Sequence, residues 1–256
     1  MFKIEEFDIK LDTDVIGRNF YYFDEIDSTN SYLLDESNIK INGSVVLAEN
    51  QLKGRGRRDR NWTSVKEQSL TFSILLNRNL NAKNINILNL GASLAVAQAI
   101  ENLYQLDVEL KWPNDILVGG KKVAGILLDA VSKGDKIEKV VVGFGINVNQ
   151  PNFTGKFLIP ATSIKLEFKR DSNRERLLSE ILNFFESILI QIDKDKSKIL
   201  SDWRARCKMI GEKIKITDSN GEKFGKFEDI DDEGFLLFES RGILEKIHFG
   251  DVSIRR

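Results

Sequence analysis

One short stretch of glycines and arginines contains the residues of this chain best suited to bind an anion. Four arginines fall within six positions and a tryptophan follows; the stretch comprises Gly54, Arg55, Gly56, Arg57, Arg58, Asp59, Arg60, Asn61 and Trp62. Guanidinium groups match the oxygens of carboxylates and phosphates, and glycine lets the backbone approach a ligand closely. An anion site, a nucleic-acid contact and a merely solvated loop all stay open here. Because its like charges repel, we expect this loop to be mobile without ligand and suited to act as a lid.

Two further segments place charged side chains next to predicted strands. Pro113 cannot lie inside a central strand, so the chain bends there and presents Lys111, Asn114 and Asp115 at a strand end. Lys122 begins an otherwise apolar strand. It is either the charged end of a hairpin or a buried cation that pairs with an anion.

The spacing of apolar residues predicts the elements that position these groups. Strands are expected at 20–23, 45–48, 69–76, 108–112, 116–118, 121–129 and 137–147, and helices after residue 30 and at 85–106, 174–192 and 197–208. From residue 211 short strands alternate with turns, which is typical of a small β-barrel. We therefore predict an α+β fold: a mixed, largely antiparallel sheet with helices packed on it in residues 1–210, and a small β-barrel domain in residues 211–256.

The composition excludes several classes of protein. Of 256 residues, 41% are hydrophobic, which suffices for a sizeable core, and the net charge of −1 argues against a generally basic nucleic-acid binder. The single cysteine, Cys207, and the single histidine, His248, allow no internal disulfide, multi-cysteine zinc site or Ser-His-Asp triad. No apolar run approaches the roughly 20 residues of a membrane span, and the N-terminus lacks a signal-peptide core. We expect a cytoplasmic protein with no metal site of its own.

Five segments of the chain together form a pattern that resembles a known family. They are residues 27–30, the glycine-arginine stretch with Gln51 before it, 111–115, 120–127 and 143–147. In this order and at roughly this spacing they resemble the biotin protein ligases, also called biotin–[acetyl-CoA-carboxylase] ligases, over nearly the whole chain. The resemblance implies a fold like that of the class II aminoacyl-tRNA synthetases, followed by an SH3-like β-barrel. It also implies that biotin reacts with ATP, which carries Mg²⁺, to form biotinyl-5′-AMP, and that biotin passes to a lysine of a biotin carboxyl carrier protein.

The resemblance implies a catalytic set of four residues. Lys122 should hold the biotin carboxylate, Arg57 should neutralise carboxylate and phosphate, and Lys111 should touch the phosphates. Asp115 either receives the proton of the carrier lysine or helps to orient the metal. No covalent enzyme intermediate is needed, which agrees with the scarcity of His and Cys.

The resemblance also implies a set of substrate-binding residues, most of them polar or glycine. Ser28, Thr29 and Gln51 should bind the ureido ring of biotin, while Trp62 and Asn147 should flank the adenine. The full set is Ser28, Thr29, Asn30, Gln51, Gly54, Arg55, Gly56, Arg57, Arg58, Trp62, Lys122, Gly125, Gly145 and Asn147. Two alternatives stay open: that Ser28 and Thr29 serve only as helix caps, and that Asn147 serves only to satisfy backbone groups.

Two departures from the family pattern bear on the loop and on DNA. Asp59 stands where the family usually has glycine, which would make the loop stiffer or less favourable to anions. Only 27 residues precede Ser28, too few for the helix-turn-helix domain of the repressor-type members. The resemblance is therefore to the ligase-only class, and no DNA partner is expected.

Other activities and the mode of assembly are separate questions. A lipoate-type carboxylate ligase would perform the same adenylation, and a nucleic-acid-binding regulator would use the basic loop instead. The apolar strand at 138–147 could be a sheet edge through which two copies pair or the carrier docks, with Val142 at its centre. The alternative is that this strand lies in the middle of the sheet.

Overall fold

The structure is a computed structural model. It describes residues 1–39, 41–58, 60–77, 84–133, 136–155, 157–218, 221–248 and 250–254. Asp59, the unusual residue of the basic loop, lies outside the described residues, so its effect stays a prediction.

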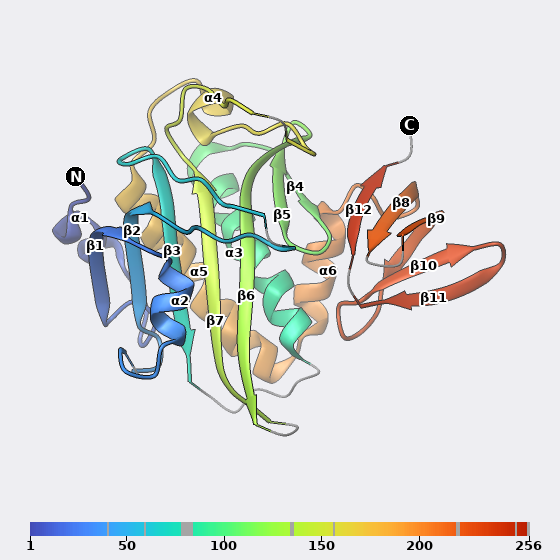
Figure 1. The fold of residues 1–256 in the computed structure, drawn as a ribbon, viewed down its shortest axis with the longest axis horizontal. Coiled ribbons are helices and arrows are strands. Elements are labelled where there is room, and N and C mark those ends of the chain that lie inside the picture. The colour runs from blue at the N-terminus through green and yellow to red at the C-terminus, as the bar shows by residue number, and fades with distance from the viewer. Residues whose placement is uncertain are drawn as a thin grey trace.

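A seven-stranded sheet forms the larger part of the molecule. Its strands are β1 Phe20–Ile26, β2 Val45–Gln51, β3 Ser69–Leu76, β4 Val108–Lys111, β5 Asp115–Val118, β6 Lys121–Lys133 and β7 Lys136–Asn147. They are ordered β1-β2-β3-β7-β6-β5-β4 (Figure 1). Only β1 and β2 are parallel, and the other neighbours are antiparallel. The predicted mixed, largely antiparallel sheet is confirmed.

The edge-strand hypothesis for residues 138–147 is wrong. β7 pairs with β3 on one side and with β6 on the other, so it lies at the centre of the sheet. Val142 is fully buried opposite Ile74 and Leu128. An apolar run without alternation is equally typical of a strand buried on both faces, and that is what this run encodes.

Three long helices cover one face of the sheet, which places the main core there. They are α3 Ile85–Tyr104, α5 Arg174–Lys194 and α6 Ser197–Arg206, and Figure 1 shows them together behind the strands. The short α2 Thr29–Leu34 contacts β2, β3 and β7 and lies in front of them (Figure 1). The helices α1 Ile4–Lys10 and α4 Ile164–Phe168 were not predicted. Both are short, and α1 has no side-chain cap that would mark its start.

The C-terminal part is a five-stranded antiparallel sheet. Its strands are β8 Lys213–Asp218, β9 Gly221–Ile230, β10 Leu236–Ser240, β11 Ile243–Ile247 and β12 Asp251–Ile254, in the order β11-β10-β9-β8-β12. It joins the larger part through buried and polar contacts. The indole nitrogen of Trp112 donates to the carbonyl of Gly234 at 3.1 Å, and Arg204 Nε donates to Asp229 at 2.7 Å. Among the helices described, none is long and apolar enough to cross a membrane.

Candidate active site

A cavity of about 600 Å³ gathers most of the residues that the sequence singled out. Fourteen of the sixteen predicted residues line it: Ser28, Thr29, Asn30, Gln51, Arg55, Gly56, Arg57, Trp62, Lys111, Asp115, Lys122, Gly125, Gly145 and Asn147. Gly54 and Arg58 do not. A Cβ at Gly54 would overlap the backbone oxygen of Trp62, so this glycine lets the loop fold back on itself. Arg58 instead lies 3.4 Å from Asp251.

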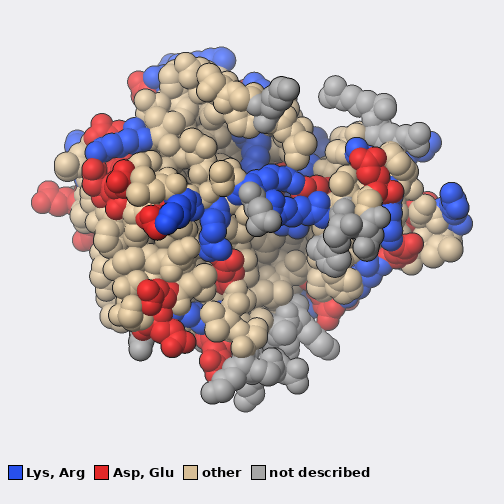
Figure 2. Space-filling model, in the orientation of Figure 1, with Lys and Arg blue, Asp and Glu red and all other residues tan. Residues whose placement is uncertain are grey.

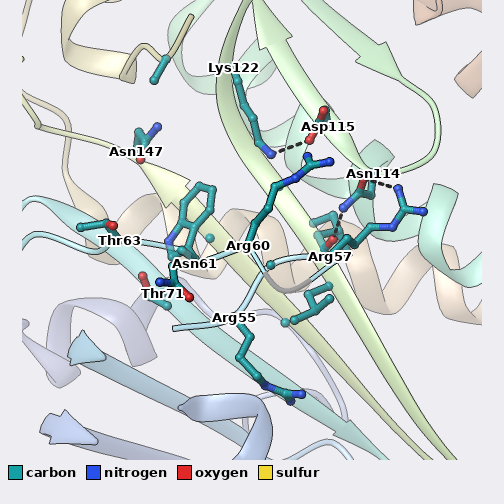
Figure 3. A pocket seen from close by; sticks show the side chains of 18 of the residues that line it. Arg55, Arg57, Arg60, Asn61, Thr63, Thr71, Asn114, Asp115, Lys122 and Asn147 are labelled. Carbon is teal, nitrogen blue, oxygen red and sulfur yellow. Dashed lines mark hydrogen bonds and ion pairs between the residues drawn. The ribbon is translucent and has the colours of Figure 1, made fainter. Parts of the chain in front are cut away.

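A carboxylate between two lysines forms the charged centre of the cavity. Asp115 lies 2.5 Å from Lys122 Nζ and 3.4 Å from Lys111 Nζ. Figure 3 shows Lys122 and Asp115 facing each other. Burial raises the pKa of Asp115, but the two ammonium groups outweigh burial and hold that pKa below its ordinary value. Burial lowers the pKa of Lys111, and Asp115 opposes this only in part. The group is thus an ionised carboxylate between two lysine side chains.

The backbone explains why these side chains meet. Lys111 and Asp115 are opposite each other in the β4–β5 hairpin. The turn between them is fixed to β6, because Asn114 Nδ2 donates to the Ile126 carbonyl at 2.6 Å and Ile126 N donates back to Asn114 O at 3.0 Å. Lys122 is held from the other side, where its N–H donates to Pro160 O at 2.8 Å.

A buried polar network lies where α2 meets the sheet. Gln51 Oε1 accepts from both the backbone N–H of Thr29 at 2.8 Å and its hydroxyl at 3.1 Å. Thr29 Oγ1 also shares a 2.6 Å hydrogen bond with Ser73. Ser28 caps α2 by accepting from the N–H of Ser31, and because it also lines the cavity, its contact with biotin stays a prediction. Thr29 and Gln51 are therefore held rigidly in the cavity wall.

Two aspartates that the sequence did not single out hold the basic loop. Arg55 lies 2.7 Å from Asp129 on β6, and Asp129 also accepts from Asn30 at 2.8 Å. The remaining arginines of the loop converge on Asp251 of the C-terminal sheet; they are Arg57, Arg58 and Arg60. Figure 2 shows basic side chains gathered near the middle of this face, and in Figure 3 Arg55 points away from the Lys122–Asp115 pair. These arginine–aspartate pairs join residues as far as 74 and 193 positions apart in the sequence, so a local motif cannot predict them.

A glycine on a central strand makes room for an aromatic side chain. A Cβ at Gly145 would overlap the indole of Trp62, whereas one at Gly125 would make ordinary contact with it at 3.7 Å and lie closer to Lys122. On β3 the alternation turns Ser69, Thr71 and Ser73 away from the helix-covered core, and all three are buried. Thr71 lines the cavity opposite Gly145. This part of the cavity wall therefore combines a glycine with small polar side chains.

Asn147 uses its amide within the protein. Its Nδ2 donates to the Thr162 carbonyl at 3.0 Å, and its Oδ1 accepts from Gln150 at 3.1 Å. Sequence reasoning missed Gln150 and the apolar cavity segment around it: Phe153, Phe157, Leu158 and Ile159. Nothing in the local sequence marks that segment as part of a site, because it has neither periodicity nor a charged motif.

Comparisons with known proteins agree with this geometry. Residues 22–147 match the biotin/lipoate A/B protein ligase family, and residues 209–255 match the biotin protein ligase C terminal domain. The bifunctional ligase/repressor BirA of Bacillus subtilis is 33% identical over 98% of this chain and 79% of its own length. The biotin–[acetyl-CoA-carboxylase] ligase of Mycobacterium tuberculosis is 32% identical over 88% of this chain and 85% of its own.

A solved structure matches equally well. The biotin protein ligase from Aquifex aeolicus, in complex with biotin and ATP, is 31% identical with a TM-score of 0.81, covering 93% of this chain and 99% of that one. The chain therefore belongs to the biotin/lipoate A/B protein ligase family, among its biotin protein ligases.

Proposed function

We propose that this protein activates biotin with ATP and transfers the biotinyl group to a lysine of a biotin carboxyl carrier domain. In the first step the biotin carboxylate attacks the α-phosphorus of ATP, which forms biotinyl-5′-AMP and expels pyrophosphate. In the second step a lysine amine attacks the mixed anhydride and expels AMP. The observation that carries this proposal is the Lys122–Asp115–Lys111 cluster in a cavity lined by the ligase motifs.

The first step brings two anions together, so it requires cations at the point of contact. Lys122 is placed to bind the biotin carboxylate, and Lys111 and Arg57 to bind phosphate oxygens. Arg57 is half-buried and lies within 3.4 Å of Asn114 Oδ1, which keeps its guanidinium beside the cluster. Mg²⁺ carried with ATP would neutralise phosphate charge. Among the described residues no three His, Cys, Asp or Glu side chains form a group that could hold a metal ion.

The lowered pKa of Asp115 argues against its acting as a base and supports a role that the sequence did not suggest. A carboxylate whose pKa lies below its ordinary value is a weak base at neutral pH. It is well suited to hold two ammonium groups in place by charge and hydrogen bonding. We therefore assign Asp115 the positioning of Lys122 and Lys111, and we do not assign it the proton of the carrier lysine.

The remaining predicted residues bind the two ends of the intermediate. Thr29 and Gln51 are preorganised by their mutual hydrogen bonds to meet the neutral ureido ring. Trp62 offers its indole face to the adenine. Closure of the loop from Arg55 to Arg60 would exclude water from the reactive anhydride.

The carrier domain and a second copy of the chain are the proposed partners. Among the described strands, none pairs with β6 beyond Gly125 on the side away from β7, although β6 continues to Lys133. That free edge, with the exposed Val131, replaces β7 as the proposed site of homodimer pairing. The net charge of −1 does not favour nucleic acid as a partner. The use of ATP and the single, buried Cys207 favour a cytoplasmic location.

An ATP–pyrophosphate exchange assay tests the proposal. Exchange should depend on added biotin, and lipoate should neither support it nor compete at equal concentration. Exchange driven by lipoate instead of biotin would replace the proposed substrate by that of the lipoate ligases in the same family.

A further inference from the structure

One carboxylate of the C-terminal sheet reaches the cavity of the larger part. Asp251, the first residue of β12, lines the cavity, and the other described residues that line it lie between positions 28 and 161. The Asp251 carboxylate lies 3.4 Å from Arg58 Nη1 and 3.9 Å from Arg57 Nη1, and it accepts from Arg60 Nη2. The C-terminal part therefore contributes a charged group to a site that is otherwise built by the larger part.

The backbone just before Asp251 supplies a second acceptor to the loop. Arg57 Nη1 donates to the carbonyl of Gly250 at 3.4 Å and to Asn114 Oδ1, also at 3.4 Å. Gly250 has a φ of 152°, and a Cβ there would come within 2.8 Å of Ile216 Cγ2 on β8. Glycine is thus required for β12 to begin so close to β8. Two consecutive residues at the start of β12 contact the guanidinium of Arg57.

The start of β12 is held in the C-terminal sheet, and that sheet is attached beside the charged cluster. Asp251 is paired with Thr217 of β8 in an antiparallel ladder. The indole nitrogen of Trp112 donates to the carbonyl of Gly234, and Trp112 directly follows Lys111 in the chain. The C-terminal sheet is thus bound one residue away from Lys111, so the carboxylate of Asp251 has a defined place relative to the cluster.

The charges at this junction do not balance. Three guanidinium groups, those of Arg57, Arg58 and Arg60, share the single carboxylate of Asp251. Without that carboxylate the three cations would repel one another and the loop would spread. With it, three positive charges face one negative charge, so an excess of positive charge remains at the cavity. A triphosphate carries enough negative charge to neutralise that excess.

We propose that Asp251 is a positioning residue for the nucleotide, which holds the loop arginines together so that the triphosphate of MgATP meets a preformed group of cations. The inference rests on the proposed function. The phosphate-binding site is then shared: the arginines come from the larger part, and the carboxylate that orders them comes from the C-terminal sheet. At the biotin end, Thr29 and Gln51 are held by each other and by Ser73, so that end should not depend on Asp251.

The test measures each substrate separately in biotin-dependent pyrophosphate exchange. Asp251→Asn keeps the size of the side chain and removes its charge. The KM for ATP should rise about tenfold, the effect of one lost charged contact, while kcat and the KM for biotin change by less than about twofold. Asp251→Glu, which keeps the charge, should have a KM for ATP close to that of wild type. A merely structural role would lower the active fraction and leave both KM values unchanged.

Asp229→Asn is the matched control. It breaks another ion pair of the C-terminal sheet, the one with Arg204 at 2.7 Å, and neither residue lines the cavity. It should leave the KM for ATP unchanged. A folded Asp251→Asn protein with the wild-type KM for ATP, or an equal rise in Asp229→Asn, overturns the proposal. A KM for ATP in Asp251→Glu as high as in Asp251→Asn overturns it as well.

A measurement on wild-type protein decides the question even if Asp251→Asn does not fold. When biotin and MgATP are added, hydrogen–deuterium exchange of the backbone amides in residues 251–254 should slow together with that of Arg55–Arg58. Slowing in the loop alone overturns the proposal. A wild-type protein without biotin-dependent pyrophosphate exchange refutes the proposed function itself.

Discussion

Replacing Lys122 by alanine removes the cation that we place against the biotin carboxylate. In the structure Lys122 Nζ lies 2.5 Å from Asp115, whose other partner, Lys111, is 3.4 Å away. The variant therefore keeps one partner for the buried carboxylate. We expect a loss of about 1–3 kcal/mol of unfolding free energy, below the 3–5 kcal/mol of a fully orphaned buried charge. The variant should remain folded.

The effect on the reaction should be larger than the effect on stability. Removing one preorganised group that stabilises developing charge costs about 10²–10³ in rate. Biotin-dependent pyrophosphate exchange should fall by that factor in Lys122→Ala, and the KM for biotin should rise. The assay needs only the purified protein, biotin, ATP and labelled pyrophosphate.

The neighbouring lysine supplies a matched control. Lys121 carries the same charge, but its ammonium lies 2.5 Å from Glu167, outside the cavity wall. Because this pair is partly exposed, Lys121→Ala should cost at most about 1 kcal/mol of stability and leave exchange nearly unchanged. Near-normal exchange by a folded Lys122→Ala protein, or an equal loss in Lys121→Ala, would refute the role of Lys122.

Three further expectations follow from the ion pairs. Asp251→Asn should speed tryptic cleavage within Arg55–Arg60, because it removes the carboxylate that holds three of the arginines. In wild-type protein, biotin with ATP should slow the same cleavage. Unchanged rates in both comparisons would argue against a closing loop. Glu49→Gln should cost about 3–5 kcal/mol in urea unfolding, because it leaves the buried Arg174 cation without the carboxylate 2.7 Å away; a cost under about 1 kcal/mol would contradict this reading. The pKa of Asp115 is lower in the folded protein than its ordinary value of 3.8. The ion pairs of Asp115 therefore stabilise the fold fully at pH values above 3.8, and this stabilisation is lost as the pH falls through the pKa of the folded protein. The stability difference between wild type and Asp115→Asn should therefore shrink in acid, and a difference independent of pH would count against it.

The sequence predicts those parts of the fold that depend on local pattern. The helix α3 and the strands β3, β6 and β7 follow from apolar spacing, and the β5–β6 hairpin follows from its two glycines at positive φ, Gly119 and Gly120. Strand order does not follow from such patterns. The apolar run of β7 is compatible with an edge or a centre, and only pairing with both β3 and β6 decides for the centre.

The sequence likewise predicts only some of the residues of the candidate site. Residues that belong to contiguous motifs, such as Lys111, Asp115 and Lys122, were found from the sequence and meet in the cavity. Asp251 and Gln150 were missed, because their importance arises from what they contact across the fold. Asn147 was also found; its amide contacts Thr162 and Gln150, and its place beside the adenine stays a prediction. A sequence motif identifies a residue, whereas the hydrogen bonds in the structure show which atoms of that residue are already paired.

The most direct test of the proposed reaction is a mass measurement of the product that the purified protein makes from biotin and MgATP. We predict biotinyl-5′-AMP together with an equal amount of pyrophosphate, and loss of the adenylate with a matching gain of one biotinyl group when a biotin carboxyl carrier domain is added. Release of pyrophosphate without biotinyl-5′-AMP, or an adenylate formed from lipoate and not from biotin, would contradict the account.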